Sequence, residues 1–368
     1  MFIEKVDKET ILKPLQVVIG IVERKQTLPI LSNVLLEHQD GKVRFTATDL
    51  EIQITTTADI AQKGDAEQSV TIGGKKLLEI LRVLPDESRI SIDTKENKAQ
   101  IKTNKSRFSL QTLPAQDFPK LNSQLENAKK ITLEQGKLRS LLFSVQYAMA
   151  QQDVRYYLNG VLLVAEGNEL KAVATDGHRL AFNKGIIEGN LEKQEIILPR
   201  KAVLELSKLL SDGTDTVELE ISPQQVKASF SGITLITKVI DGKFPDYERV
   251  IPKYNNHLGM NRVLIQQALQ RAAILSNEKF RGVRFVLTEK NLSIISSNSE
   301  QEEAQEEIET DYHGEALDIG FNVNYLMEGL NNLGGETATF SFGDPNSSIL
   351  ITTPDNSEFR YVVMPMRI

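Results

Sequence analysis

Apolar residues recur at intervals of three and four in six stretches of the chain, the spacing of a helix with one buried face. Leu12, Leu138 and Leu264 hold corresponding places in three of these stretches and are equally spaced along the chain. The six predicted helices therefore form three pairs, which are 10–22 with 75–83, 136–149 with 201–210, and 260–275 with 322–333.

Between the predicted helices, the pattern changes to an alternation of apolar and polar residues, which is typical of strands with one buried face. The alternation along 45–54 changes phase at Asp49, so two strands with a turn or bulge between them are predicted there. Alternation also marks 217–221, and 235–239 is rich in residues that favour strands. These elements together predict an α+β fold, with helices packed on one face of antiparallel sheets.

Three segments of the chain resemble one another and have the same length, at 33–49, 160–176 and 282–298. A dipeptide that ends in proline follows each segment, at Phe118-Pro119, Phe244-Pro245 and Met364-Pro365. Landmarks that share one period predict three copies of one unit. The predicted domains are 1–127, 128–254 and 255–368, with polar linkers at the two boundaries.

The 368 residues include 43 Lys and Arg against 50 Asp and Glu, and the net charge of -7 argues by itself against nucleic-acid binding. The charge is unevenly distributed, however. Five of the six predicted helical segments carry a net positive charge, so the acidic excess lies outside the helices. Lys and Arg favour helices by propensity, but Glu does so equally and is sparse in these segments. A basic helical layer that faces phosphate is therefore a live hypothesis.

Composition and motifs exclude several classes of function. The absence of Cys removes thiolate metal sites and Cys nucleophiles, and it indicates a reducing compartment. The chain has no phosphate-binding glycine loop, dinucleotide fingerprint or nucleophile elbow. Its N-terminus is charged throughout and no run of 18 apolar residues occurs, so we expect a cytoplasmic protein without membrane contact. No cofactor and no metal are expected.

Among four widely spaced histidines, His178 is the best candidate for catalysis. The favoured interpretation of its segment is a turn, in which Asp176 and Gly177 supply the bend. The less favoured alternative is a hydrolase-like enzyme assembled around His178, Asp176 and Arg179. The acidic run of 300–307 is interpreted as a solvated face or as half of a charge pair between chains, because no metal-binding loop accompanies it.

Six long motifs carry a resemblance that extends over the whole chain. They are Thr-Leu-Pro-Ile-Leu at 27–31, Gln-Asp-Val-Arg-Tyr-Tyr-Leu-Asn-Gly at 152–160, Ala-Thr-Asp-Gly-His-Arg-Leu at 174–180, Lys-Phe-Pro-Asp-Tyr at 243–247, Ala-Ala-Ile-Leu-Ser-Asn-Glu-Lys-Phe-Arg-Gly-Val at 272–283 and Tyr-Val-Val-Met-Pro-Met-Arg-Ile at 361–368. With these motifs the chain resembles the beta subunits of bacterial DNA polymerase III, the sliding clamps.

The resemblance implies a DNA-clamp fold of three repeated domains and a head-to-tail homodimeric ring, with helices that line the hole and sheets on the outside. Geometry independently favours two chains. Six helices spaced at about 10 Å enclose almost no hole, whereas twelve leave on the order of 28 Å, enough for a duplex. The implied function is a processivity factor without catalytic activity, which encircles duplex DNA of any sequence.

The resemblance also implies protein partners, which bind through short peptides: the DNA polymerase III alpha subunit, the clamp loader delta subunit, other DNA polymerases, mismatch-repair proteins and ligase. Their site in the family is a hydrophobic cleft, where Met and Leu offer an adaptable apolar surface. The matching positions are Leu158, Thr175, Gly177, His178, Arg179, Leu180, Pro245, Arg249, Val250, Tyr325, Ser348, Val362, Met364, Pro365, Met366 and Arg367.

Two further sets of residues are carried over from the family. The dimer contact pairs the first domain with the third domain of the partner, and it matches Lys75, Lys76, Phe108, Leu110, Ile274, Leu275, Glu300, Glu302, Glu303 and Glu306. The DNA contact matches Arg24, Lys25, Lys76, Gln152 and Lys201.

The chain departs from the family's usual pattern at three places. Glu23-Arg24-Lys25 stands where relatives commonly have Gly-Gly-Arg, which leaves open which side chain reaches phosphate. Gln305 interrupts the acidic run, and Gln151 replaces a frequent His. The alternatives to a sliding clamp are a three-repeat scaffold that does not bind DNA and, less favoured, the enzyme around His178.

Overall fold

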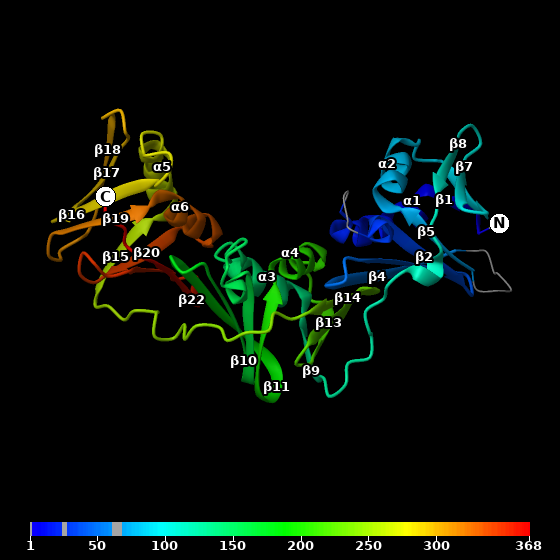
Figure 1. The fold of residues 1–368 in the computed structure, drawn as a ribbon. Coiled ribbons are helices and arrows are strands. Elements are labelled where there is room, and N and C mark those ends of the chain that lie inside the picture. Colours follow the sequence, from blue (N-terminus) through cyan, green and yellow to red (C-terminus); the bar gives the residue numbers. More distant parts are fainter. Residues whose placement is uncertain (1, 24–27, 61–67) are drawn as a thin grey trace. The chain divides into compact units, whose positions relative to one another are not determined.

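The computed structural model describes residues 2–23, 28–60 and 68–368 (Figure 1). Six α-helices occur in these ranges, and each one overlaps a helix predicted from periodicity. They are α1 (Lys8–Val18), α2 (Gly74–Val83), α3 (Gln135–Gln146), α4 (Arg200–Leu209), α5 (Arg262–Ala273) and α6 (Val323–Asn332). None of the helices in the described ranges is long and apolar enough to cross a membrane.

The three repeats follow one order of elements: a strand, a helix, four strands, a second helix and three strands. The first repeat contains β1 (Ile3–Asp7), β2 (Asn33–Gln39), β3 (Lys42–Thr48), β4 (Ile52–Asp59), β5 (Gln68–Gly73), β6 (Arg89–Lys95), β7 (Lys98–Lys102) and β8 (Arg107–Gln111). The third contains β15 (Asn256–Asn261), β16 (Gly282–Thr288), β17 (Asn291–Ser297), β18 (Glu303–Glu309), β19 (Leu317–Asn322), β20 (Thr337–Phe342), β21 (Ile349–Thr353) and β22 (Asn356–Val363).

The second repeat has the same order, but two of its strands are long enough to occupy two positions each. These are β10 (Gly160–Thr175) and β11 (Arg179–Pro199), whose register shifts around Gly167. Its other strands are β9 (Lys129–Glu134), β12 (Thr216–Ile221), β13 (Gln225–Phe230) and β14 (Ile233–Lys238). The segments that resemble one another in sequence begin strands β2, β10 and β16, which confirms the predicted repeat.

The strands form four antiparallel sheets, and two of these sheets cross from one repeat to the next. The eight-stranded sheet runs β5-β2-β3-β4-β14-β13-β12-β9, and β4 meets β14 with Ile54 opposite Leu235. The six-stranded sheet runs β10-β11-β22-β21-β20-β15, and β11 meets β22 with Leu180 opposite Val362. Two four-stranded sheets, β1-β6-β7-β8 and β18-β17-β16-β19, each lie within one repeat.

The compact units of the chain follow these shared sheets instead of the sequence repeats. One unit comprises Met1–Leu138 with Leu204–Val239, and the other comprises Arg139–Val203 with Ile240–Ile368. Strand pairing across a repeat boundary creates dense contacts between residues far apart in sequence, so the middle repeat contributes to both units. The predicted boundaries at 127 and 254 stay predictions.

The first helices of the three repeats correspond in a register that differs slightly from the predicted one. Ile11, Leu138 and Ile265 are equally spaced and are all 0 % exposed, whereas Leu264 is 58 % exposed. The apolar pattern misled here because Val263, Leu264 and Ile265 are all apolar, and only packing distinguishes the buried one. The side chain of Asn261 caps α5 by accepting from the N–H groups of Val263 and Leu264, which fixes the start of the helix at Arg262.

The predicted turns are confirmed, and the first two repeats build theirs in the same way. In the first, Asp49 Oδ1 accepts from the N–H of Ile52 at 2.9 Å. In the second, Asp176 Oδ1 accepts from the N–H of His178 at 2.9 Å and that of Arg179 at 3.1 Å. Gly177 between them has φ +90°, a conformation that side chains disfavour. The segment around His178 is therefore a side-chain-closed turn between β10 and β11.

The four-stranded sheet of the third repeat is covered by a helix of the same repeat. In the third repeat, α5 contacts β17 and β18, and the hydroxyl of Ser296 donates to the carbonyl of Ala272 at 2.6 Å. Beneath it, Phe285 and Phe321 meet edge to face with ring centroids 5.6 Å apart, and both are 0 % exposed. A side chain of this size buried without exposure contributes about 3–5 kcal/mol to stability when compared with Ala.

Candidate peptide cleft and edge strands

An apolar cluster lies where β11 meets β22, at the junction of the second and third repeats. Leu158, Leu180 and Val362, all predicted cleft residues, are 1 %, 3 % and 1 % exposed. Phe244 and Leu350 belong to the same cluster, and Tyr157, Phe182, Ile240, Tyr247 and Ile251 pack against it. The structure thus brings together residues from five separate segments of the sequence.

His178, Tyr325, Met364 and Met366 border this cluster, and we call these four residues the wall of the cleft. The rings of His178 and Tyr325 stack at 17°, with centroids 6.4 Å apart. The N–H of Met364 donates to the carbonyl of His178 at 2.9 Å, and the N–H of Met366 donates to the carbonyl of Gly320 at 2.8 Å. Met364 is 49 % exposed, so its side chain is available to a partner.

Arg179 lies behind this wall, because its donors are engaged within the chain. Its Nε donates to Asp176 Oδ2 at 3.1 Å, its Nη2 donates to the carbonyl of Tyr147 at 2.7 Å, and its Nη1 donates to Glu328. The guanidinium also lies 4.6 Å from the ring centroid of Tyr325. The resemblance places this Arg among the peptide contacts; it is 8 % exposed and lies against the ring of Tyr325, and its contact with a peptide stays a prediction.

The enzyme alternative around His178 loses its orienting acid in this geometry. The oxygens of Asp176 accept from backbone N–H groups of the turn and from the side chain of Arg179. The ring of His178 stacks on Tyr325. A general-base histidine needs a partner that orients its imidazole, and Asp176 is engaged elsewhere.

The remaining predicted cleft residues lie around the same junction. After the buried Phe244, Pro245 and Arg249 are exposed, with Arg249 paired to Asp246 at 2.8 Å, and Val250 is 45 % exposed. The other four are Thr175, whose hydroxyl donates to the Arg179 carbonyl at 2.6 Å, Ser348, whose carbonyl accepts from Tyr254, Pro365, which is half-buried, and Arg367, which is exposed.

A polar cavity of about 520 Å³ adjoins the wall on the side of Arg179. Asp153, Arg200 and Glu328 are among its lining residues. Hydrogen bonds from the side chain and backbone of Arg155 lower the pKa of Asp153 to about 2, so this carboxylate is charged at neutral pH. Arg200 donates to the carbonyl of Met149 at 3.2 Å.

The structure contains functional positions that sequence reasoning missed. Phe244 and Leu350 belong to the cluster, and Tyr147 and Glu328 hold Arg179. The Phe-Pro dipeptide is a landmark of the repeat, and that signal could have identified Phe244 as an anchor of the cleft. Glu328 carries no comparable signal, because its role depends on a contact with a residue 149 positions away.

The predicted DNA-contact residues lie at several separate places. Arg24 and Lys25 are outside the residues that the structure describes. Lys76 is exposed on α2 and Lys201 is half-buried on α4. Gln152 is exposed in the loop after α3 and has φ +55°.

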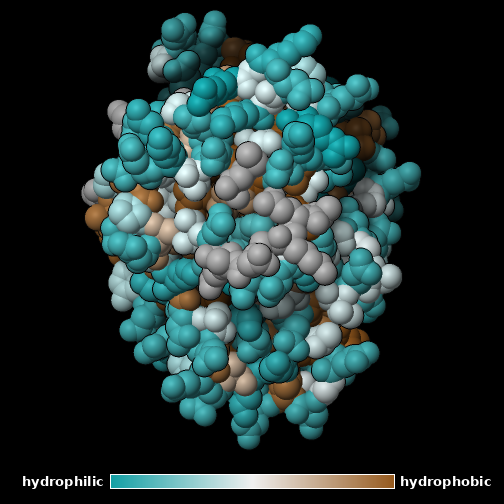
Figure 2. All heavy atoms as spheres, turned by 90° about the vertical axis from the view of Figure 1, so that its right-hand side faces the viewer, coloured by the Kyte–Doolittle hydropathy of each residue, from teal (hydrophilic) through white to brown (hydrophobic). Residues whose placement is uncertain are grey.

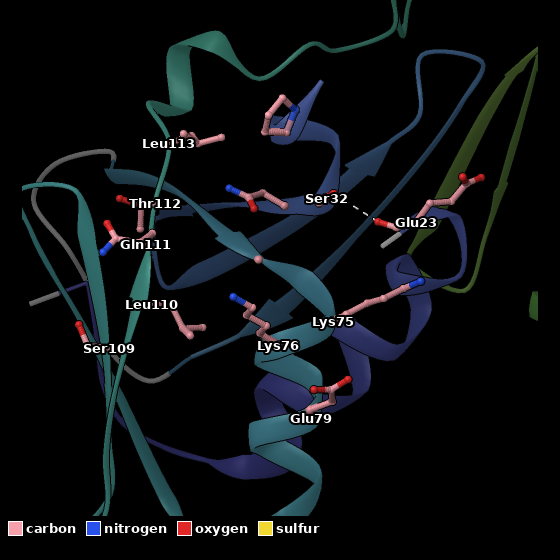
Figure 3. Close-up of a pocket in the computed structure, with 13 residues that line it drawn as sticks. Glu23, Ser32, Lys75, Lys76, Glu79, Ser109, Leu110, Gln111, Thr112 and Leu113 are labelled. Atoms are coloured by element: carbon pink, nitrogen blue, oxygen red, sulfur yellow. Dashed lines mark hydrogen bonds between the residues drawn. The ribbon is translucent and has the colours of Figure 1, made fainter. Parts of the chain in front are cut away.

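A hollow of about 890 Å³ in the first repeat lies between α2 and the edge strand β8 (Figure 3). Figure 3 shows Lys75 and Lys76 from α2 and Leu110 from β8 among the residues that line it. Figure 2, which looks onto the side of the molecule that carries the N-terminus, shows hydrophilic residues over most of that face and apolar ones in small areas. An interface there would combine backbone pairing and charge with a small apolar contact.

The two edge strands β8 and β18 have matching patterns. Phe108 and Leu110 are half-buried in β8 and alternate with exposed residues, and β18 alternates in the same way from Glu303 to Glu309. At the end of α5, Ile274 is 77 % exposed, and Leu275 beside it is half-buried. Glu300, Glu302 and Glu303 are exposed as well.

Part of the predicted acidic run is paired within the chain. Arg271 of α5 donates to both oxygens of Glu306, at 2.9 and 2.6 Å, and this lowers the pKa of that carboxyl. Gln305 donates to Ser293 and to Glu307. Fewer carboxylates of β18 are therefore available for a partner than the sequence indicated. Their pairing with basic residues of a second chain stays a prediction.

Comparison with known proteins places the whole chain in one family. Models of the DNA polymerase III beta subunit match its N-terminal domain at residues 2–122, its central domain at 132–246 and its C-terminal domain at 248–367. The beta sliding clamp of Pseudomonas putida is 45% identical over 368 residues, which is 99% of both chains. That of Escherichia coli is 42% identical over 364 residues, again 99% of both chains.

Solved structures agree with the family models. The crystal structure of DNA polymerase III subunit beta from Pseudomonas aeruginosa has a TM-score of 0.94 at 41% identity, over 99% of each chain. A sliding clamp from the same organism, bound to griselimycin, has a TM-score of 0.93 at 42% identity over 99% of each chain. The chain belongs to the DNA polymerase III beta subunit family, the beta sliding clamps.

Proposed function

We propose that the chain is a processivity factor of DNA replication, which encircles duplex DNA as a ring and tethers DNA polymerases to it. Its membership of the beta sliding clamp family supports this function, and the chain is an accessory subunit of DNA polymerase III, not an enzyme. The observation that carries the ring is that β8 and β18, both edge strands, hold the repeat positions of strands that pair at the internal junctions.

The internal junctions predict how a second copy joins. β4 of the first repeat meets β14 of the second, and β11 of the second meets β22 of the third. The strand of the third repeat that corresponds to β4 and β11 is β18, and the strand of the first that corresponds to β14 and β22 is β8. Both are edge strands of their sheets. One copy's β18 would therefore join another copy's β8, and two such seams close a head-to-tail dimer.

The hollow between α2 and β8 indicates which side chain of a second copy packs at the interface between the two copies. An added Cβ on Gly20 would lie 2.1 Å from Glu205 Oε2, so the end of the first helical segment approaches α4 closely at the first junction. Gly20 and Ile274 are the same number of residues apart as the helix N-caps Asp7 and Asn261, so Ile274 of the third repeat corresponds to Gly20 of the first. Glu79, which corresponds to Glu205, lines the hollow. By this correspondence Ile274 of one copy enters the hollow of the other.

The hole of such a ring requires only weak attraction for DNA. Lys76, Lys201 and Gln152 on or beside the helices, together with Arg24 and Lys25, are the proposed phosphate contacts. Contacts with phosphate carry no sequence information, and a closed ring stays on DNA by topology. Strong contacts would slow sliding.

The cleft at the β11–β22 junction is the proposed tether for client proteins. Its apolar floor and the exposed Met364 suit a short peptide with apolar side chains. The proposed clients are the alpha subunit of DNA polymerase III, the clamp loader delta subunit, other DNA polymerases, mismatch-repair proteins and ligase. Tethering raises the effective concentration of a polymerase at the primer end. The cytoplasm, where the replicated chromosome lies, is the proposed location.

Solution mass tests the ring. One chain has a mass of 41.2 kDa, and sedimentation equilibrium is expected to give twice that value. A mass of one chain at micromolar concentration would contradict the closed dimer, because the two edges of one chain would then lack partners.

A further inference from the structure

Two glycines on neighbouring strands of the third repeat leave a slot on the surface of the sheet. Gly282 begins β16 and lies opposite Asn322 of β19, while Gly320 of β19 lies opposite Arg284. A Cβ added to Gly320 would lie 2.5 Å from the carbonyl oxygen of Met366. Neither glycine has a positive φ, so close approach of another segment explains the missing side chains.

The C-terminal end of the chain occupies this slot. The Cδ1 of Ile368 would lie 3.1 Å from a Cβ on Gly282 and 2.8 Å from one on Gly320. The N–H of Met366 donates to the carbonyl of Gly320 at 2.8 Å. On the cleft side, the N–H of Met364 donates to the carbonyl of His178 at 2.9 Å. Backbone hydrogen bonds thus hold the tail on both sides of Pro365.

We infer that Gly282 and Gly320 form a seat for Ile368 that sets the position of Met364 and Met366 at the partner cleft. This inference rests on the proposed function of the cleft, and it makes Gly320 and Ile368 positioning residues, since neither belongs to the apolar floor. A methionine side chain has three rotatable bonds and adapts to many surfaces, so its own flexibility does not define a cleft. A tail held at two places presents both methionines with less conformational entropy to lose on binding.

The seat contributes to binding more than to folding. Ile368 is 60 % exposed, so its packing on the glycines removes little apolar surface from water. Ile368 lies on the surface of the sheet, and its displacement opens no cavity in the core. Changes in the seat are therefore expected to alter partner affinity at nearly constant melting temperature.

The test uses the full-length chain and two probes in surface plasmon resonance, griselimycin and the isolated alpha subunit of the same organism's DNA polymerase III. Gly320→Ala is expected to weaken both probes about tenfold, mainly through faster dissociation. Gly282→Ala is expected to weaken them less, because its nearest neighbour is the flexible end of Ile368. Gly259→Ala is the matched control, since its nearest atom lies 3.9 Å away.

A pair of compensating substitutions distinguishes a positioning role of the seat from a general loss of structure. Ile368→Ala removes the atoms that crowd an added methyl at Gly282, so Gly282→Ala is expected to cost little further affinity when it is made in the Ile368→Ala background. Gly320→Ala keeps most of its cost in that background, because its methyl meets the backbone oxygen of Met366. Deletion of Ile368 alone avoids any misfolding of the sheet and is expected to weaken both probes at unchanged melting temperature.

Three results decide the inference. Equal affinities for Gly320→Ala, the Ile368 deletion and Gly259→Ala would overturn it while leaving the cleft intact. Failure of the unaltered chain to bind either probe would overturn the proposed cleft and this inference together. Weaker binding by Gly320→Ala and by the Ile368 deletion, with the cost of Gly282→Ala abolished only in the Ile368→Ala background, would establish the seat.

Discussion

The two sheet junctions inside the chain share one backbone plan and differ in the side chains placed on it. At the first, the N–H of Lys238 donates to the carbonyl of Glu51 at 2.9 Å, and their side chains form an exposed ion pair at 3.1 Å. At the second, the corresponding bond joins Met364 to His178, also at 2.9 Å. The same backbone pairing therefore carries exposed charged side chains at the first junction and apolar side chains at the second.

The strand positions next to these residues differ in the same way. Ile52 of the first junction is 2 % exposed and lies opposite Thr237. Its counterpart in the second repeat is Arg179, which lies opposite Val363 and is held by Asp176 and Glu328. The first junction is sealed by apolar packing. At the second junction, a polar network replaces part of that packing and holds the residues that border the cleft. The two junctions therefore share one backbone pairing, and their function depends on the side chains.

The largest contrast between the junctions is expected from loss of the tail. Deletion of 364–368 removes the exposed methionine and the backbone bond to His178, so binding of the alpha subunit should fall by about a hundredfold or more. Lys238→Ala, at the corresponding place of the first junction, should leave binding unchanged. Surface plasmon resonance on both variants, with sedimentation to show an intact dimer, tests this contrast. Undiminished affinity after the deletion would refute the cleft assignment.

The third junction, between copies, is expected to be the weakest of the three, because no covalent chain crosses it. Replacement of Ile274 and Leu275 by Ala removes the apolar contact proposed for the hollow, at about 2 kcal/mol for each side chain. Sedimentation should then show monomers at micromolar concentration. Leu264→Ala, at an exposed leucine of α5, should leave the mass of a dimer. A dimer that survives the double replacement would argue against this seam.

Substitution of one buried residue at each internal junction distinguishes an effect on the free energy of unfolding from an effect on partner affinity. Ile52→Ala should lower the free energy of unfolding by about 2–4 kcal/mol and leave partner affinity unchanged, because it creates a cavity away from the cleft. Arg179→Met keeps most of the volume and should cost about 1–3 kcal/mol, since the carboxylates left behind are reached by water. Its larger effect should be weaker binding, because Tyr325 loses the guanidinium beneath it. Urea unfolding and binding measured on both variants would show the reverse pattern if Arg179 only stabilised the fold.

The smallest effect is expected from the exposed pair of the first junction. The side chains of Lys238 and Glu51 are 44 % and 66 % exposed, so Lys238→Ala should change the free energy of unfolding by about 0–0.5 kcal/mol. Any change should diminish in high salt, because solvent-exposed charges are screened. Urea unfolding at low and high salt measures both quantities. A loss of several kcal/mol would show that this junction, too, depends on charge.

Local features of the fold were predictable from the sequence. All six helices follow from apolar spacing, and the turn at Asp176 follows from its residues, because each depends on neighbours within a few positions. The junctions were not predictable in this way. The pairing of Ile54 with Leu235 joins residues of different repeats, and no periodicity records which edge strands meet.

The candidate site shows the same division. Resemblance to the family named Leu180, Val362 and Met364, and the structure brings these residues to one junction. It did not indicate that Arg179 lies behind the wall, since burial depends on the contact with Glu328 from a distant helix. The error in register at Leu264 has a related cause, because adjacent apolar residues are equivalent in a pattern and differ only in packing.

The ring is tested most directly by topology. The chain would be loaded on a nicked circular duplex with its clamp loader, separated from free protein by gel filtration, and measured again after the DNA is cut once. The account predicts that the protein stays with the circle and is lost from the linear molecule, because a ring slides off a free end while phosphate contacts alone are weak. Equal retention on circular and linear DNA would contradict encirclement.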